Sequence, residues 1–526
     1  MSEAPPLQSP LMAKRRAKRL RPARRSRGEL PNVEELFAPY QPLLPTTDWA
    51  ELCEAFKRPL PSTFWVHPAR LSPNDVMTRF QEHGFDATVM PWLSSGVSLP
   101  AGVSLGRRFE YRAGLIHTQE ATSMLPPLAL DPQPGELVLD LCAAPGGKSA
   151  QLSLMMQGRG TLIVNDLSFA RLSALRATQE RLGLTNMVLC AGEGERLLEG
   201  HPPCFDKVLV DAPCSCEGTI RKKGQWSFEA ERGDFRAGLR ATQLKLLTHA
   251  LKLTKVGGRV VYSTCTLDPL ENESVVHEAL GLLEAEGGSA ELRPVTWERL
   301  KTAPGVTEWA GERYHDALEL CARVYPHQND TGGFFIASIE VTAQSQRGLE
   351  RDELLTRGWR QASDLTPPNE EALYAWSRDV FGIGEERYAG LRFVQTSKRH
   401  ASALCEELLI PPTRVEVSGL PVFHTKGRLP HFTTAAALKW GHLSTRQRFE
   451  LQSEQEVDLF YQGKLIPAEG RGVERGDVFV IYEGRSLGCG FCFPEAERGE
   501  LTLSSLYPKA IQLAEGRSAF ERADLA

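Results

Sequence analysis

The sequence predicts an α/β fold whose central sheet is mostly parallel, with a smaller unit on each side. From about Leu137, short apolar runs alternate with longer stretches in which Leu and Ala recur at helical spacing. Strands alternating with helices are typical of βαβ units and a parallel sheet. With 526 residues, the chain is also too long for one ordinary domain, and about three are expected.

Each apolar run of this block has the length of a buried strand, and each longer stretch has the spacing of a helix. The expected strands are Leu137–Leu141, Thr161–Val164, Met187–Cys190, Lys207–Val210, Arg259–Tyr262 and, near the end of the block, Gly333–Val341. The expected helices are Ser149–Met156, Phe169–Leu182 and Leu239–Leu253.

The flanking segments have a different texture. Residues 35–105 mix a helical stretch, Asp48–Phe56, with a strand-like one, Ser62–Val66, and predict a small α+β unit. The polar, helix-prone stretch Leu349–Glu386 predicts a connector. From Arg414 the chain is Gly-rich and predicts a mostly β module. Its β-type runs are Val415–Val417, Val457–Tyr461, Val478–Tyr482 and Leu501–Leu503.

The composition indicates a soluble globular protein, with 41% hydrophobic and 24% charged residues. No apolar run approaches the roughly 20 residues that span a bilayer. The basic N-terminus is followed by polar sequence and so does not resemble a secretory signal. Eleven scattered cysteines indicate reduced thiols rather than a disulfide framework. We therefore expect a cytoplasmic protein.

The net charge of −5 is unevenly distributed, because residues 1–28 hold nine Lys and Arg and one Glu. Such a tail can bind phosphates without reading sequence. It can equally be a disordered, solubilising extension, or the product of an upstream start with Met12 as the alternative initiator. The sequence leaves these alternatives open.

A Gly-rich turn follows the first strand of the block, where the chain reads Asp140-Leu141-Cys142-Ala143-Ala144-Pro145-Gly146-Gly147-Lys148. Small residues at a strand-to-helix turn let a ligand approach the backbone, and the helix start offers unpaired N–H groups. A tight packing turn is the alternative. The turn does not match the Gly-x-Gly-x-x-Gly pattern, which disfavours nicotinamide and flavin cofactors.

Two acidic residues follow the next two strands. Asp166 is placed to accept hydrogen bonds from ribose hydroxyls, or to cap the helix that starts near Ser168. Glu193 is placed to face an adenine edge, although an exposed loop glutamate is the commoner fate of such a residue.

Thiols follow the fourth and fifth strands, in Asp211-Ala212-Pro213-Cys214 and Ser263-Thr264-Cys265. Ligands of open α/β sheets bind at the carboxyl ends of the strands, so Asp211, Cys214 and Cys265 are expected to converge beside the cofactor. A single cysteine after a strand is usually a small buried hydrophobe. Two in equivalent positions favour a function.

A thiol is what methylation of a pyrimidine at carbon 5 requires. This carbon is a poor nucleophile until a thiolate adds to carbon 6; after methyl transfer a base removes the carbon-5 proton and the thiol is eliminated. Asp211 is the candidate acid for ring nitrogen 3. Spacing alone does not say which of the two thiols attacks.

At these residues the sequence resembles the Nop/Sun family of RNA (cytosine-C5) methyltransferases, in particular its bacterial 16S ribosomal RNA branch, methyltransferase F. The resemblance runs from Pro61 to the C-terminus. It is dense in Gln119-Glu120-Ala121, Ser123-Met124-Leu125-Pro126, Cys142–Lys148, Asp211–Gly218, Gly257–Thr266, Glu271-Asn272-Glu273, Pro326-His327 and Gly332–Ile336.

The resemblance implies a class I (Rossmann-like) methyltransferase with a seven-stranded sheet and S-adenosyl-L-methionine as cofactor. The cofactor contacts it implies are Cys142, Ala143, Ala144, Pro145, Gly146, Gly147, Lys148, Asp166, Glu193 and Asp211. It also implies that Cys265 attacks carbon 6, that Cys214 is required for product release, and that Asp211 lies close to the base.

Two positions depart from the family pattern. Glu193 stands where Asp is common, and Cys216 stands in Cys-Ser-Cys where Cys-Ser-Gly is usual. We interpret Cys216 as inert, with a Cys214–Cys216 disulfide as the alternative.

The resemblance also divides the chain. The expected parts are a basic disordered tail (1–28), an N-terminal RNA-binding domain (29–110), the methyltransferase domain (111–345), a helical connector (346–412) and a C-terminal PUA-like RNA-binding module (413–526). We expect no metal site, because Cys489 and Cys492 have ligand spacing but no second pair or nearby His.

The expected partner is RNA, most specifically 16S ribosomal RNA or the small ribosomal subunit, bound by a monomer. The Arg221-Lys222-Lys223 run is a candidate wall of the RNA channel, and a solvated charge run is the alternative. Transfer RNA methylation, a role as a ribosome-assembly factor, and methylation of a small molecule or protein are the competing functions; the last leaves the paired thiols without a task.

Overall fold

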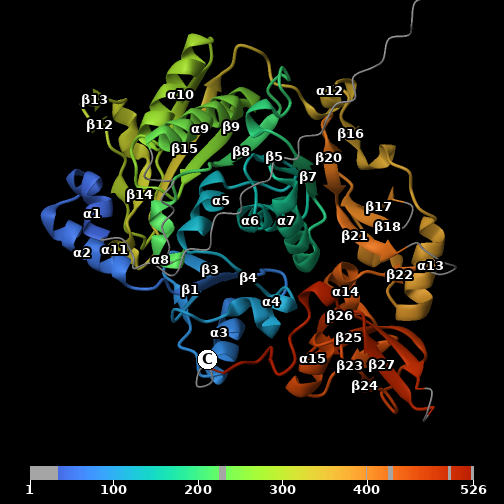
Figure 1. Ribbon diagram of the computed structural model, residues 1–526. Helices are drawn as coiled ribbons and strands as arrows, with labels where there is room; N and C mark the ends of the chain where they lie inside the picture. The colour runs from blue at the N-terminus through green and yellow to red at the C-terminus, as the bar shows by residue number, and fades with distance from the viewer. Residues whose placement is uncertain (1–32, 224–232, 398–399, 425–429, 496–498, 523–526) are drawn as a thin grey trace, which may run out of the picture.

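The computed structural model describes residues 33–223, 233–397, 400–424, 430–495 and 499–522. The basic tail, residues 1–28, lies outside the described residues. A central sheet crosses the middle of the molecule, with the N-terminal unit below it and the C-terminal parts along one side (Figure 1).

Five parallel strands form the centre of this sheet in the order β7-β6-β5-β8-β9. They are β5 (Leu137–Asp140), β6 (Thr161–Asp166), β7 (Met187–Ala191), β8 (Phe205–Asp211) and β9 (Thr254–Thr264). β15 (Phe334–Ala343) pairs antiparallel with β9. The strands are buried on both faces, which is why they read as continuous apolar runs. The predicted mostly parallel α/β sheet is confirmed.

Helices cover both faces of the sheet. α9 (Gly233–Leu253) and α10 (Glu273–Ala285) pack on one face, in the hydrophobic cluster that contains Val208 and Val260. The short α5 (Leu125–Leu130), α6 (Gly147–Met155) and α7 (Phe169–Leu182) pack on the other, in the cluster that contains Val138 and Leu209. The carboxyl ends of the parallel strands are left open between these layers.

The sheet has ten strands, so the predicted number of seven is wrong. β10 (Ser289–Arg293) and β14 (Ala322–Val324) both pair with β15, and the two-residue β11 (Ala303–Pro304) pairs with β14. At the other edge, β20 (Val415–Ser418) pairs antiparallel with β7. The sequence predicts Val415–Val417 as a strand, but a local pattern does not show that this strand pairs with β7.

The N-terminal unit is an antiparallel sheet in the order β2-β3-β1-β4 with two helices, as the predicted α+β unit requires. Its elements are β1 (Ser62–Val66), α3 (Pro73–Glu82), β2 (Thr88–Met90), β3 (Leu93–Leu99), α4 (Phe109–Arg112) and β4 (Ile116–Thr118). The predicted boundary at residue 110 is wrong, because Trp65 pairs with His117 and so ties β4 to this unit.

Two helices precede this sheet and pack elsewhere. α1 (Val33–Phe37) and α2 (Thr46–Lys57) join a hydrophobic cluster with Ile220, Leu267 and Tyr325 of the central domain. They lie beside α8 (Ile220–Lys223) and α11 (Pro326–Asn329) (Figure 1).

Residues 346–412, predicted to be a helical connector, contain both helices and strands. α12 (Arg351–Thr356), β16 (Arg360–Gln361) and α13 (Glu370–Phe381) come first, followed by β17 (Leu391–Ser397), β18 (His400–Cys405) and β19 (Leu409–Ile410). β17 and β18 form a four-stranded sheet with β21 (Leu420–His424) and β22 (His431–Phe432), so the predicted boundary at 413 divides a sheet. β18 has no β-branched residue, and tertiary packing overrides its weak propensity.

The C-terminal module is a five-stranded sheet in the order β23-β25-β26-β27-β24, with α14 (Thr434–Trp440) and α15 (Glu454–Tyr461) packed on it. Its strands are β23 (Arg448–Glu450), β24 (Ile466–Pro467), β25 (Gly476–Tyr482), β26 (Arg485–Pro494) and β27 (Leu501–Ser505). The run Val457–Tyr461, predicted to be a strand, is helical because Ser453 caps α15 by accepting from the Glu456 N–H at 3.2 Å.

The N-terminal unit and the C-terminal module share one hydrophobic core. The ring of Phe109 stacks on that of Phe520, with centroids 5.5 Å apart, and the Phe109 N–H donates to the Ala519 carbonyl at 2.9 Å. Ala519 and Phe520 therefore lie against the N-terminal unit. Within the described residues, none of the helices has the length and apolar character that a bilayer crossing requires.

Candidate active site

The Gly-rich turn between β5 and α6 is held closely against its neighbours. Gly146 has φ +105°, and a Cβ there would lie 2.8 Å from Cγ of Leu175. The Ala143 N–H donates to the Asn165 carbonyl at 2.8 Å, and the Ala144 N–H to Oδ2 of Asp166 at 3.1 Å. A residue other than glycine at 146 would be strained, so the sequence fixes the path of this turn.

A cavity of about 900 Å³ opens beside the turn. Seven of the predicted site residues line it: Cys142, Ala143, Ala144, Pro145, Gly147, Lys148 and Asp211. Its other walls come from the N-terminal unit, with Tyr111 and Arg112, and from the C-terminal module, with Leu438 and Tyr507. Three separate parts of the chain thus enclose one cavity.

Asp166 and Glu193 are not among the residues that line this cavity. The buried carboxylate of Asp166 accepts from the N–H groups of Ala144 and Ser168, so it anchors the turn and the start of α7. The side chain of Glu193 is 55% exposed and lies 3.7 Å from Arg196. Their contact with a cofactor remains a prediction.

Asp140, at the end of β5, lines the cavity and is buried. Its Oδ2 accepts from the Ser149 hydroxyl at 2.6 Å, whereas Oδ1 has no hydrogen-bond partner in the described part of the chain. Burial raises the pKa of Asp140 to about 7. An unpaired carboxylate oxygen and an open turn suit a ligand that carries cationic groups, as S-adenosyl-L-methionine does. The residues present therefore fit this cofactor.

Asp211, at the end of β8, links the cavity to the thiols. Its Oδ2 accepts from Nζ of Lys148 at 2.7 Å, and its Oδ1 accepts from the hydroxyl of Ser263 at 2.9 Å. Burial alone would lower the pKa of Lys148, but the carboxylate of Asp211 outweighs burial and raises it. A charged lysine is thus held at the cavity wall, within electrostatic reach of Cys265.

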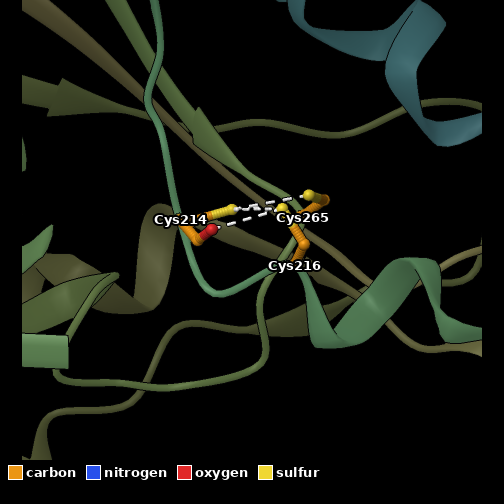
Figure 2. Close-up of side chains that lie close together, drawn as sticks. All are labelled: Cys214, Cys216 and Cys265. Atoms are coloured by element: carbon orange, nitrogen blue, oxygen red, sulfur yellow. Dashed lines mark hydrogen bonds between the residues drawn. The ribbon is translucent and has the colours of Figure 1, made fainter. Parts of the chain in front are cut away.

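Three cysteine side chains, those of Cys214, Cys216 and Cys265, converge and point toward one another (Figure 2). Sγ of Cys214 lies 3.4 Å from Sγ of Cys265 and 3.8 Å from Sγ of Cys216. The predicted convergence of Cys214 and Cys265 is observed, and Cys216 joins them. All three are partly exposed, and none forms a disulfide.

The three thiols influence one another's ionisation. Contacts with Cys216 and Cys265, together with burial, raise the pKa of Cys214 well above its ordinary value. The contact with Cys214 lowers the pKa of Cys265, but Cys216 and burial outweigh it, so this pKa is also raised. At neutral pH both are held as thiols until a base or a positive charge assists ionisation.

Gly218 fixes the loop that carries Cys265. Its N–H donates to the Cys265 carbonyl at 2.9 Å, and its own carbonyl accepts from the Gly333 N–H at 3.0 Å. A Cβ at 218 would lie 2.2 Å from the Gly333 carbonyl oxygen. Only glycine lets the two loops approach so closely.

A buried acidic cluster supports the Cys214 loop from behind. The Ser215 N–H donates to Glu271 at 3.1 Å, and the Ser215 hydroxyl donates to Glu217 at 2.6 Å. Arg236 donates to Glu217 at 2.9 Å and to Asp268 at 2.8 Å. Burial, followed by the charge of Glu217, raises the pKa of Glu271 to about 7.

The sequence pattern predicts no role for Glu217 or Asp140. The family resemblance included the segments that contain Glu217 and Glu271, but only burial shows what these side chains do. The same applies to Glu120, whose carboxylate accepts from the N–H groups of Thr122 and Gly332 and lines the cavity.

The basic run Arg221-Lys222-Lys223, which was the candidate wall of the RNA channel, lies on α8. Arg221 is buried and pairs with Asp330 at 2.6 Å, so its guanidinium does not form the predicted channel wall; the side chains of Lys222 and Lys223 lie outside the described residues. Cys489 and Cys492 on β26 pack into different hydrophobic clusters.

Comparisons with known proteins show which family the chain belongs to. The family model described as 16S rRNA methyltransferase RsmB/F matches residues 127–340. A tRNA (cytosine(49)-C(5))-methyltransferase of Pyrococcus abyssi is 38% identical over 49% of this chain and 81% of its own length. A ribosomal RNA small subunit methyltransferase F of Shewanella halifaxensis is 30% identical over 82% of this chain and 88% of its own length.

A solved structure gives the same result. The crystal structure of a methyltransferase homologue from Pyrococcus horikoshii is 35% identical, with a TM-score of 0.51 over 58% of this chain and 94% of its own. The central domain thus has the class I methyltransferase fold. The chain belongs to the Nop/Sun family of S-adenosyl-L-methionine-dependent RNA (cytosine-C5) methyltransferases.

Proposed function

We propose that this enzyme methylates carbon 5 of a cytosine in 16S ribosomal RNA through a covalent adduct between Cys265 and carbon 6. The observation that carries the mechanism is the placement of two thiols 3.4 Å apart, beside an Asp–Lys pair that lines the cavity. Methylation of an exocyclic amine or a hydroxyl needs no such pair.

In the first half of the reaction the Cys265 thiolate forms a bond to carbon 6. The π electrons of the carbon 5–carbon 6 bond then become available at carbon 5. The carboxylate of Asp211 stabilises the ring by passing a proton from the charged Lys148 to nitrogen 3. Before that transfer, the charge of Lys148 favours the thiolate of Cys265.

The cofactor supplies an electrophilic methyl group to carbon 5 when it is bound. The turn from Cys142 to Lys148 would hold it, with Asp140 placed for its cationic groups and with Asp166 fixing the turn from behind. Asp166 and Glu193 complete the set of residues that we propose for cofactor binding.

In the second half, Cys214 in its thiolate form accepts the carbon-5 proton, and the electron pair of that carbon–hydrogen bond re-forms the carbon 5–carbon 6 double bond. Nitrogen 3 returns its proton to the Asp211–Lys148 pair, and the sulfur–carbon 6 bond breaks. Its electron pair returns to Cys265 as the ring double bond re-forms. We assign Cys214 to this release step, because its sulfur lies next to that of Cys265 and its loop is fixed by Ser215, Glu217 and Glu271.

A pair of variants tests this division of roles. Cys214→Ala should accumulate an RNA–protein adduct that survives denaturing electrophoresis, because attack proceeds and release fails. Cys265→Ala should neither form the adduct nor methylate RNA. The reverse pattern would overturn the assignment, and Cys492→Ala, in the C-terminal module and not among the residues that line the cavity, is the control for loss of a buried thiol.

The proposed target is ribosomal because the ribosomal relatives match the flanking parts as well as the catalytic domain. The ribosomal enzyme of Erwinia tasmaniensis, for example, matches 85% of this chain, whereas the transfer RNA enzyme matches 49%. We propose that residues 58–118 and the C-terminal module, in a PUA-like role, bind RNA, and that the enzyme acts as a monomer in the cytoplasm.

Bisulfite sequencing of RNA from a deletion strain identifies the target. Loss of one or more 5-methylcytosines from 16S ribosomal RNA is expected. Loss from transfer RNA alone would support the second candidate, which the 38% identity to a transfer RNA enzyme favours. Restoration of ribosome assembly, but not methylation, by Cys265→Ala would identify an assembly role.

A further inference from the structure

The third thiol of the site has no part in the proposed reaction. Sγ of Cys216 lies 3.8 Å from Sγ of Cys214 and 3.2 Å from the Cys214 carbonyl oxygen. Cys216 has φ +64°, a conformation that favours glycine. The chain therefore holds a sulfur beside the two others at a position where a side chain is disfavoured.

We propose that Cys214, Cys216 and Cys265 form a three-thiolate site for Zn²⁺, and that the bound ion blocks methylation by occupying the attacking sulfur. The block of methylation rests on the proposed function of Cys265. The metal site itself does not.

The spacing of the sulfur atoms matches such a site. Zinc–sulfur bonds are about 2.3 Å long, so sulfurs at the corners of a tetrahedron around zinc lie about 3.8 Å apart. The sulfur–sulfur distances from Cys214 are 3.4 and 3.8 Å, and all three sulfur atoms lie within 4.8 Å of one another. Small rotations of the side chains would therefore close the site.

The chemistry of the thiols also suits a soft cation. Coordination forms three zinc–sulfur bonds and releases three protons to solvent, since a coordinated thiol is deprotonated outright. Thiolate ligands select zinc and copper(I) over magnesium and calcium. The fourth position remains for water, because the carboxylate of Asp211 is already paired with Lys148.

The nearby acidic cluster is a weaker candidate for a cation. Glu217, Asp268 and Glu271 also lie close together, but Arg236 is bonded to two of them and Ser215 to the third. The three thiols instead contact one another.

Direct binding tests the proposal without any RNA. The full chain, reduced with a phosphine and freed of metal, is titrated with Cd²⁺, whose bonds to thiolates absorb in the ultraviolet, and then challenged with Zn²⁺. The band should saturate at one equivalent and be reversed by Zn²⁺. Cys216→Gly should weaken binding by about 100-fold or more, beyond the loss expected for a group that does not touch the metal.

Cys216→Gly is a suitable variant because glycine adopts the φ of this position without strain. Cys492→Ala is the matched control and should bind as the wild type does. The proposal is overturned if Cys216→Gly retains wild-type affinity, or if the wild type gives no thiolate band.

Methylation assays then separate the metal site from the proposed function. Zn²⁺ should inhibit the wild type, whereas Cys216→Gly should stay active at the same Zn²⁺ concentration. Equal inhibition of both proteins would contradict the three-thiolate site. If neither methylates RNA but the thiolate band behaves as expected, the proposed function fails and the metal site stands.

Discussion

The loops that carry the thiols and the junction of the two terminal units both bury charge, but they balance it differently. Behind the thiol loops, arginines form ion pairs with carboxylates: Arg236 pairs with Glu217, and Arg323 pairs with Glu273. At the junction, five cationic side chains converge and donate to backbone carbonyl groups. They are Arg70, Arg112, Arg181, Lys439 and Arg485, which we call the cationic junction.

Within the described residues, no carboxylate forms an ion pair with any member of the cationic junction. Behind the thiol loops, in contrast, Arg236 and Arg323 each form an ion pair with a glutamate. Carbonyl oxygens can satisfy a guanidinium geometrically but leave its charge uncompensated. The difference indicates that the thiol loops are held rigid by neutral networks, while the junction keeps a positive potential at the cavity wall. Such a potential suits the phosphates of the proposed substrate.

The largest expected effect comes from breaking a neutral pair. Arg323 and Glu273 are fully buried, and Arg323 also donates to the Leu267 carbonyl at 2.9 Å. Arg323→Leu would leave the carboxylate of Glu273 buried without its cation, at a cost of about 3–5 kcal/mol in the free energy of unfolding. Urea denaturation followed by circular dichroism measures it.

The control is the double variant Arg323→Leu/Glu273→Leu, which removes both charges and should be more stable than Arg323→Leu alone. A double variant that is less stable would show that the pair stabilises the fold through more than charge balance.

A smaller effect is expected from the pH dependence of the acidic cluster. Glu271 has a pKa of about 7 in the folded protein, compared with an ordinary value of 4.5. Between pH 4.5 and 7, the folded protein therefore keeps a proton on Glu271 that the unfolded chain loses. Its contribution to stability is therefore lost as the pH rises from about 4.5 through 7. Over this pH range, the free energy of unfolding of Glu271→Gln should increase relative to that of the wild type by on the order of 2 kcal/mol.

Chemical denaturation at several pH values measures this difference, with Glu278→Gln, a partly exposed acid on α10, as the control. Parallel curves for the wild type and Glu271→Gln would contradict the prediction.

A junction arginine should matter less than Arg323. Arg181 donates to the carbonyl oxygens of Tyr111 and Ile116 at 2.7 and 2.9 Å and lies over the Tyr111 ring. Arg181→Leu leaves carbonyl groups unpaired but no buried carboxylate, so it should cost about 1–2 kcal/mol. A loss as large as that of Arg323→Leu in the same urea assay would remove the distinction between the two regions.

The smallest expected effect has the opposite sign with pH. Burial lowers the pKa of Lys439 to about 8, so between pH 8 and 10.5 the unfolded chain binds a proton that the folded protein does not. Wild-type stability should therefore rise with pH in this window, and Lys439→Met should lose that rise, by on the order of 1 kcal/mol. The prediction is contradicted if the difference in unfolding free energy between the wild type and Lys439→Met stays constant from pH 8 to 10.

The sequence was most informative where local pattern and burial coincide. The stretch Phe169–Leu182 was predicted with the bounds of α7, and Ser62–Val66 with those of β1. The convergence of Cys214 and Cys265 followed from the rule that the ends of parallel strands meet, without any knowledge of side-chain contacts.

The errors arose from one missed local helix cap and from contacts between distant segments. Val457–Tyr461 is as apolar as a strand, and its helical state depends on the cap at Ser453. β20 acquires its place only through pairing with β7, more than 200 residues earlier in the chain. The cavity was not predictable for the same reason, because Tyr111 and Tyr507 meet across it only after the terminal parts have come together.

The shared core of the two ends has a consequence for synthesis. Phe109 is synthesised early in translation, but its stacking partner Phe520 follows only about 400 residues later. Until then, the apolar face of the N-terminal sheet lacks its cover, and contacts of such long sequence separation form slowly. The nascent chain should therefore need protection from aggregation until the segment around Phe520 has been made and has folded, and only then is the cavity wall that contains Tyr507 complete.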